Sequence, residues 1–242
     1  MTASPSYAFA TPSDRARALY SVRAEGLADF LAGPGAQWAQ WLTATGFEAG
    51  LGDARALPDA SGAVVAGVVG LGTAQARRRG RFGIAKAVGS LPAGDWVLTG
   101  DMTLAERAEG ALGWLLAGYR FDRYRPGRKP AVLPRLVCPE GVDAARLTAM
   151  AEGEALTRDL INTPAQDMGP DELEAALMAL AARFGAKARA IVGDALVDQN
   201  FPMIHAVGRA SPRAPRLLDL RWGTEGPALT LVARGCALTP GG

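Results

Sequence analysis

The chain reads Arg158-Asp-Leu-Ile-Asn-Thr-Pro-Ala-Gln-Asp-Met-Gly-Pro-Asp-Glu-Leu173 at the point where two predicted helices meet. Asn162-Thr163-Pro164 is typical of a helix exit, because the residue before a proline avoids the helical region. Gly169-Pro170 begins the next helix, since proline is preset for the first turn. Asp171 and Glu172 then lie beside the positive end of the helix dipole. The stretch therefore predicts a short connection between two helices.

Downstream of this connection, the pattern predicts an α/β sheet with helices on its faces. The helix that opens at Pro170 ends at Gly185, which fits a left-handed cap. Its predicted buried face consists of Leu173, Leu177, Leu180, Ala181 and Phe184. The predicted strands that follow are Ala188 to Val192, Leu217 to Arg221 and Ala228 to Val232.

Upstream, the pattern predicts a second set of alternating helices and strands. Thr103-Leu104-Ala105-Glu106 has the capping-box spacing, which starts a helix running to about Tyr119. The other predicted elements are a helix from Asp14 to Leu31, strands over Ala63 to Gly72, Trp96 to Thr99 and Arg135 to Cys138, and a helix from Asp143 to about Ile161. We therefore expect a smaller α/β domain over residues 1–140 and the opening part of a second α/β domain over residues 141–242.

Composition and charge exclude several functional classes. The chain is 49% hydrophobic and 21% charged, an ordinary balance for a globular protein. Lys+Arg 26 against Asp+Glu 24 leaves a net charge of +2, which is too small to indicate nucleic-acid binding. The basic run Arg77 to Arg81 is either a solvated loop or a contact for phosphates or acidic partners. Two cysteines without a disulfide or zinc spacing, together with the lack of a leader or membrane-span pattern, predict a cytoplasmic protein.

Three stretches carry a resemblance to a known family. The connection quoted above, Asn200 to Ser211, and Arg216 to Gly223 resemble segments of the leucyl aminopeptidase (cytosol aminopeptidase) family. The resemblance is close from about residue 112 to Val232. It implies a smaller N-terminal α/β domain, a C-terminal α/β metallo-aminopeptidase domain of which the chain holds the opening part, and a homo-oligomer, usually a hexamer.

The resemblance also implies a reaction, the removal of N-terminal residues from peptide substrates. The family uses two divalent metal ions, manganese or zinc, which activate a bridging water and polarise the scissile carbonyl. The metal ligands of the family match no residue of this chain. We therefore predict no catalytic, cofactor-binding or metal-binding residue, no bound metal, and an inactive polypeptide.

The last ten residues suggest why the ligands are missing. Ala233 to Gly242 stands where the family has a Gly-Lys-Gly-Val-Cys-Phe-Asp-Thr-Gly-Gly motif, so that Arg234 replaces the lysine and Thr239 the aspartate. Codons allowed for these residues, read with one G added in front, can encode all ten positions of the motif. We expect a one-nucleotide deletion; a divergent loop is the alternative. Sequencing the coding DNA distinguishes the two.

The residues that could serve other catalytic arrangements fit structural roles better. His205 is the only histidine, so an HExxH zinc site is impossible, and its position in a family segment favours a structural role. Asp167 lies just before the acids at the helix start, where the dipole explains the negative charge without a metal. Cys236 lacks a partner base. The alternative function is a non-catalytic module for oligomerisation or interaction, and exposed strand edges predict poor solubility for the chain alone.

Overall fold

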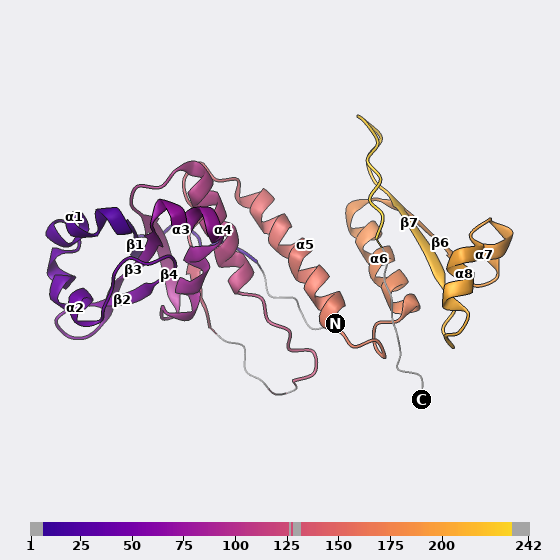
Figure 1. Ribbon diagram of the computed structural model, residues 1–242, viewed down its shortest axis with the longest axis horizontal. Helices are drawn as coiled ribbons and strands as arrows, with labels where there is room; N and C mark the ends of the chain where they lie inside the picture. Colours follow the sequence, from indigo (N-terminus) through magenta and orange to yellow (C-terminus); the bar gives the residue numbers. More distant parts are fainter. Residues whose placement is uncertain (1–6, 126, 128–131, 234–242) are drawn as a thin grey trace. The chain divides into compact units, whose positions relative to one another are not determined.

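The computed structural model describes residues 7–125, 127 and 132–233, and the chain divides into two compact units, Met1–Thr157 and Arg158–Gly242. In Figure 1 the first unit runs from indigo to pink and the second from orange to yellow. The strands of the first unit are β1 (Arg17–Arg23), β2 (Ala54–Pro58), β3 (Val64–Gly72), β4 (Gly94–Thr99) and β5 (Pro134–Leu136). Its helices are η1 (Ala24–Gly26), α1 (Leu27–Ala32), η2 (Ala36–Trp38), α2 (Ala39–Ala44), α3 (Ala74–Arg79), η3 (Gly83–Gly89) and α4 (Leu104–Ala117).

The five strands form one mixed sheet in the order β2-β3-β1-β4-β5. β1, β3, β4 and β5 are parallel, and β2 runs antiparallel to β3. Ala18 of β1 lies opposite Ala66 on one side and Val97 on the other, so β1 is an inner strand. This arrangement confirms the predicted α/β class, and β3 and β4 confirm the strands predicted there.

Helices pack on both faces of this sheet, because successive strand residues alternate between two cores. Leu19, Val69 and Trp96 belong to one core, while Val22 and Val68 belong to the other. The helical residues buried in the first core are Ile84, Ala87, Val88, Ala111, Trp114, Leu115, Leu147, Ala151 and Ala155, and those in the second are Phe30, Trp38 and Leu42. Burial of each large apolar side chain stabilises the fold by roughly 1.5–3 kcal/mol.

The inner position of β1 corrects one prediction. The sequence pattern predicted a helix from Asp14 to Leu31, whereas Arg17–Arg23 is a strand and only the short α1 follows as an α-helix. The helical prediction is wrong because β1 pairs along both of its edges, and this pairing outweighs local helical propensity. The long helix α5 (Ala144–Asn162) confirms the helix predicted from Asp143.

Helix α5 crosses the division between the two units. Leu147, Ala151 and Ala155 lie in the core of the first unit, so the compact unit extends to Thr157. The sequence places the domain junction near residue 140, before this helix. The difference arises because the buried face of α5 packs with the domain that precedes it.

Both outer strands of the five-stranded sheet have their backbone edges partly occupied. The indole Nε1 groups of Trp38 and Trp41 donate to the carbonyls of Pro58 and Ala56, at 2.8 Å and 3.3 Å. At the other edge the Ala10 amide donates to the Leu136 carbonyl at 2.8 Å. These bonds reduce the number of free backbone groups that could pair with another chain.

The second unit has fewer strands and helices among the described residues than the first. Its elements are α6 (Pro170–Phe184), β6 (Lys187–Val192), α7 (Ala195–Asp198), α8 (Pro202–Gly208) and β7 (Arg216–Arg221). β6 and β7 form a two-stranded antiparallel ladder in which Ala190 lies opposite Leu218. Gly185 closes α6 with φ 63°, as predicted, and both strands lie where the pattern placed them.

Two predictions for this unit are wrong. Ala228–Val232 is not a strand, and Leu229, Leu231 and Val232 are 82%, 85% and 92% exposed. No strand among the described residues pairs with this segment, so its backbone has nothing to hold it extended. On α6 only Ala181 of the predicted face is buried, and Phe184 is exposed.

In the part of the chain that the structure describes, no helix is long and apolar enough to cross a membrane.

Candidate functional site

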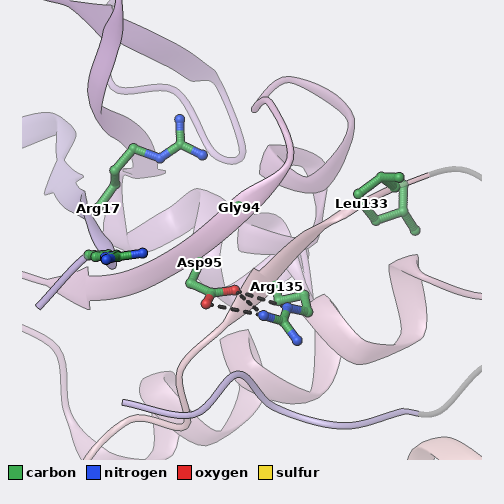
Figure 2. Close-up of a pocket in the computed structure, with 7 residues that line it drawn as sticks. Arg17, Gly94, Asp95, Leu133 and Arg135 are labelled. Carbon is green, nitrogen blue, oxygen red and sulfur yellow. Dashed lines mark hydrogen bonds and ion pairs between the residues drawn. The ribbon is translucent and has the colours of Figure 1, made fainter. Parts of the chain in front are cut away.

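A shallow depression of about 530 Å³ lies at the amino ends of β1, β4 and β5. Its lining residues are Arg15, Arg17, Gly94, Asp95, Val132, Leu133 and Arg135. Figure 2 shows Asp95 and Arg135 on adjacent strands and facing each other, with two hydrogen bonds of 2.9 Å and 3.1 Å between carboxylate and guanidinium. Three guanidinium groups against one carboxylate make the depression electropositive.

Arg17 is the most constrained of these residues. Its guanidinium donates to the Ala93 carbonyl at 2.5 Å and lies 4.2 Å from the centroid of the Trp96 ring. Gly94 adopts φ +132°, and a Cβ atom there would collide with the Arg17 guanidinium. Glycine at 94 therefore leaves room for Arg17, at the start of β1, to cover the ring of Trp96 on β4.

This position does not match the usual ligand site of an open α/β sheet, which lies outside the carboxyl ends of parallel strands. Arg17 donates hydrogen bonds to backbone carbonyls and lies over the Trp96 ring. Arg135 forms an ion pair with Asp95. The described lining residues include neither a nucleophile nor a histidine. The depression is therefore a positively charged surface feature without the groups of a catalytic centre.

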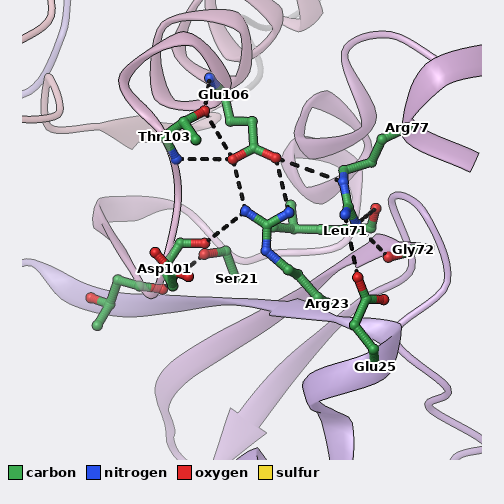
Figure 3. Close-up of polar contacts among 10 residues, drawn as sticks. Ser21, Arg23, Glu25, Leu71, Gly72, Arg77, Asp101, Thr103 and Glu106 are labelled. Atoms are coloured by element: carbon green, nitrogen blue, oxygen red, sulfur yellow. Dashed lines mark hydrogen bonds and ion pairs between the residues drawn. The ribbon is translucent and has the colours of Figure 1, made fainter. Parts of the chain in front are cut away.

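The carboxyl ends of β1, β3 and β4 hold a network of charges. Figure 3 shows Glu106, in the first turn of α4, between Arg23, Thr103 and Arg77. Arg23 donates to both carboxylate oxygens of Glu106, at 3.1 Å and 2.9 Å, and to the Asp101 carbonyl at 3.2 Å. The end of the inner strand is thereby joined to the start of a helix on the sheet.

The same glutamate completes the capping box predicted from the sequence. Its Oε2 accepts from the Thr103 amide at 2.9 Å, and the Thr103 hydroxyl accepts from the Glu106 amide at 3.2 Å. Burial opposes the charged carboxylate, but the hydrogen bonds from Arg23 and Thr103 outweigh it and lower the pKa of Glu106. The hydrogen bond with Glu106 raises the pKa of Arg23.

Arg77 extends the network to β3. Its Nη1 donates to the Gly72 carbonyl at 2.7 Å, its Nη2 lies 3.3 Å from Glu25, and its Nε lies 3.7 Å from Glu106. Two arginines thus face two glutamates, and each charge has an opposite charge within ion-pair distance. Arg77 belongs to the run that the sequence left open as a solvated loop or a phosphate contact. Its contacts are intramolecular and structural.

In the second unit, the acids that the sequence explained by the helix dipole lie against an arginine. Arg213 donates to both oxygens of Glu172, at 2.6 Å and 2.8 Å, and its Nε lies 3.6 Å from Asp171. Asp167 adds a further electrostatic attraction. The hydrogen bond from Arg213 lowers the pKa of Glu172. The cluster fixes the start of α6 to the loop before β7.

The other side chains considered from sequence are not gathered into a catalytic group. His205, on α8, has its Nε2 3.1 Å from the Asp194 carboxylate, which is almost fully exposed. Burial, together with Asp143, raises the pKa of the Cys138 thiol, which disfavours the reactive thiolate. Arg234, Cys236 and Thr239 lie outside the described residues.

The described residues do not fit a two-metal centre. Such a site needs several carboxylate, histidine or cysteine ligands around each ion. Over 7–125, 127 and 132–233, no group of three or more of these side chains is arranged to hold a metal. The acids at the carboxyl end of the sheet and at the start of α6 are paired with arginines.

Sequence reasoning found only part of these clusters. The Thr103 and Glu106 spacing and the acids at Asp171 and Glu172 were visible as helix-start signals. Arg23 and Arg213 were not recognised, because they lie 83 and 41 residues from their glutamates.

The fold defines the class: an α/β protein with one unit built on a five-stranded sheet, followed by a second α/β unit with a two-stranded ladder. The M17 aminopeptidase N-terminal domain family matches residues 18–139, and the catalytic domain of the cytosol aminopeptidase family matches residues 155–242. The chain belongs to the M17 (cytosol) aminopeptidase family. Members of this family are metal-dependent hydrolases.

Individual relatives agree with this assignment. The crystal structure of the cytosol aminopeptidase from Coxiella burnetii is 32% identical, with a TM-score of 0.77 over 88% of this chain and 46% of that one. The bottromycin maturation enzyme BotP in complex with Mn is 27% identical, with a TM-score of 0.65 over 85% of this chain and 45% of that one. A probable cytosol aminopeptidase of Methylobacterium radiotolerans is 30% identical over 72% of this chain and 39% of its own length. The chain thus spans less than half the length of these relatives.

Proposed function

We propose that this chain supplies the N-terminal domain and the opening part of the catalytic domain of a metal-dependent aminopeptidase that removes N-terminal residues from peptides. The observation that carries the proposal is the order of the two matches, with the N-terminal family over residues 18–139 and the catalytic family over residues 155–242. The division into domains over 1–140 and 141–242 is part of the same proposal.

We propose manganese or zinc as the metal of the complete enzyme. The Mn complex of BotP supports manganese, and carboxylate-rich sites suit such ions. We expect the complete enzyme to form a homo-oligomer, namely a hexamer, and to be located in the cytoplasm. The names of the cytosol aminopeptidase relatives support the cytoplasmic location.

The 242-residue polypeptide alone is proposed to be inactive. The described residues hold no three-ligand metal group. Arg234, where the family has a lysine, carries a guanidinium that stays protonated and offers no lone pair to a metal. Thr239 replaces an anionic ligand with a neutral one.

Hydrolysis of leucine amide with added manganese tests this directly. The purified chain is expected to give no turnover above the metal-only blank, while the Coxiella burnetii cytosol aminopeptidase provides the positive control. Turnover by the chain at rates typical of enzymes, on the order of 1–10³ per second, would refute the proposal.

A second candidate, a non-catalytic interaction module, is favoured by the completeness of the first unit. Its sheet has helices on both faces, its outer strands are partly capped, and the charges between β1, β3 and α4 are paired. This candidate function predicts that the first unit folds and presents a surface without the second unit. Co-purification with an intact relative, without hydrolysis by the chain alone, distinguishes this role.

A further inference from the structure

The depression at the amino ends of β1, β4 and β5 gathers positive charge at one place. Among its lining residues, Arg15, Arg17 and Arg135 are positive and Asp95 is negative. This excess of two positive charges equals the net charge of +2 of the whole chain, so the charges of all other residues balance. All the lining residues belong to the first unit. The lining of the depression is therefore formed without the second unit.

Two of the three arginines are held in fixed positions. Arg17 donates to two backbone carbonyls and lies over the Trp96 ring. Arg135 donates to Asp95 through its Nε and Nη2 atoms, and both side chains are visible in Figure 2. A guanidinium carries more donors than these bonds use. The Nε of Arg17 and the Nη1 of Arg135 therefore have donors left over among the described residues, and they are already in place for a ligand.

Arg15 is the third arginine and is not held in this way. It lies two residues before β1 and is exposed. In the described part of the chain no acid or carbonyl pairs with its guanidinium. A positive charge beside two others is disfavoured by repulsion, which a bound anion relieves. Arg15 thus supplies a complete guanidinium for a ligand.

The remaining side chains of the lining are apolar. Val132 and Leu133 border the depression, and Val132 is 81% exposed. The volume of about 530 Å³ lies within the range of small-molecule sites, roughly 300–1,000 Å³. A site with charged and apolar parts favours a ligand that carries an anionic head on an apolar body.

We infer that the depression binds a small organic phosphate, with its phosphoryl group between the three arginines and its apolar part against Val132 and Leu133. A phosphate monoester carries a charge of about −1.5 to −2 at pH 7, which matches the excess charge of the lining. Its three terminal oxygens can accept from separate guanidiniums at once, whereas a carboxylate matches a single guanidinium fork. The inference is independent of the proposed function, because it concerns binding and no chemical step.

Phosphorus NMR of phenyl phosphate titrated with the full chain at about pH 7 tests the inference. Saturable broadening of the phenyl phosphate signal is expected, with a weaker effect on inorganic phosphate, which has no apolar body. Benzoate carries the same ring on a planar monoanion, so it should compete poorly with phenyl phosphate. These three probes separate the charged head from the apolar part.

Variants of the chain locate the binding. Arg15→Ala is expected to weaken the affinity for phenyl phosphate about ten-fold, the factor for one lost charge-assisted hydrogen bond. Arg79→Ala is the matched control, since Arg79 is also exposed and loses the same charge but does not line the depression. Its affinity should stay near that of the parent. Val132→Ser should weaken the binding of phenyl phosphate and leave that of inorganic phosphate unchanged.

Four outcomes overturn the inference: no saturable binding by the parent, equal weakening in Arg15→Ala and Arg79→Ala, equal affinity for phenyl phosphate and inorganic phosphate, or competition by benzoate as strong as that by phenyl phosphate itself. The substituted side chains are exposed, so the variants are expected to melt as the parent does, and circular dichroism checks this. Because the assay measures no hydrolysis, its failure leaves the proposed function untouched.

Discussion

Arg23 and Glu106, 83 residues apart, form a bidentate ion pair that joins the end of the inner strand β1 to the capping box of α4. A guanidinium and a carboxylate match in this geometry, because two parallel N–H···O bonds form at once. The side chains are 25% and 27% exposed, so solvent screens the pair only in part. This pair connects sheet and helix at the carboxyl ends of parallel strands, the edge at which open α/β sheets usually bind ligands.

Removal of the charge on Glu106 should destabilise the first unit. Glu106→Gln keeps a side chain that can complete the capping box but weakens the bonds from Arg23. The expected loss in the free energy of unfolding is about 1 kcal/mol, the value for a partly exposed charged hydrogen bond. Urea denaturation followed by tryptophan fluorescence measures it. In Glu25→Gln, whose carboxylate is more exposed, the midpoint should stay near that of the parent.

The same pair predicts a dependence of stability on pH. The pKa of Glu106 is lowered in the folded state, so its contribution is fully present above the unfolded pKa of about 4.3 and is lost as the pH falls through the folded pKa. Between pH 6 and pH 3 the melting temperature of the parent should therefore fall more than that of Glu106→Gln. Parallel curves for the two proteins would contradict the assignment.

Gly94 should not tolerate a side chain. Gly94→Ala places a Cβ against the Arg17 guanidinium at φ +132°, and such a backbone costs of order 1–3 kcal/mol for an L-residue. Gly89→Ala is the control, since a Cβ there meets nothing within 4 Å. Thermal melts of the two variants should differ clearly, with Gly89→Ala close to the parent. Equal effects would contradict both the clash with Arg17 and the backbone strain at φ +132°.

The two tryptophans that cap β2 should differ in cost. Trp38 is buried with its indole 2.8 Å from the Pro58 carbonyl, whereas Trp41 is 46% exposed and its bond to Ala56 is 3.3 Å long. Trp38→Phe is expected to cost about 2 kcal/mol through the lost bond and the smaller ring, and Trp41→Phe about 0.5 kcal/mol. Chemical denaturation gives both values. A larger loss for Trp41→Phe would mean that capping of the open edge outweighs burial.

Several elements were predicted because their signals are local. The Thr103 and Glu106 spacing located α4, Pro170 and Gly185 located the ends of α6, and glycines closed β3. Each signal acts within one or two turns of the chain, where neighbouring residues decide the backbone conformation. The connection from Arg158 to Leu173 likewise carried the family resemblance, which the domain matches confirmed.

Errors arose where distant pairing decides the conformation. Arg17–Arg23 was predicted to be helical but is an inner strand, and Ala228–Val232 was predicted to be a strand but is exposed. The first gains two partner strands that lie far along the chain, while the second has none among the described residues. Strand formation depends on partner strands. A β pattern in the sequence is therefore neither sufficient nor necessary for a segment to form a strand.

By itself, the sequence determined the α/β class, the helix ends and the family, because caps, turns and apolar periodicity act between near neighbours. Only the tertiary structure decided that β1 is an inner strand, that Arg23 and Arg213 satisfy acids at distant helix starts, and that the apolar surface of the second unit is open. Those features depend on contacts between residues far apart in the chain, and their energy appears only when the fold brings both partners together.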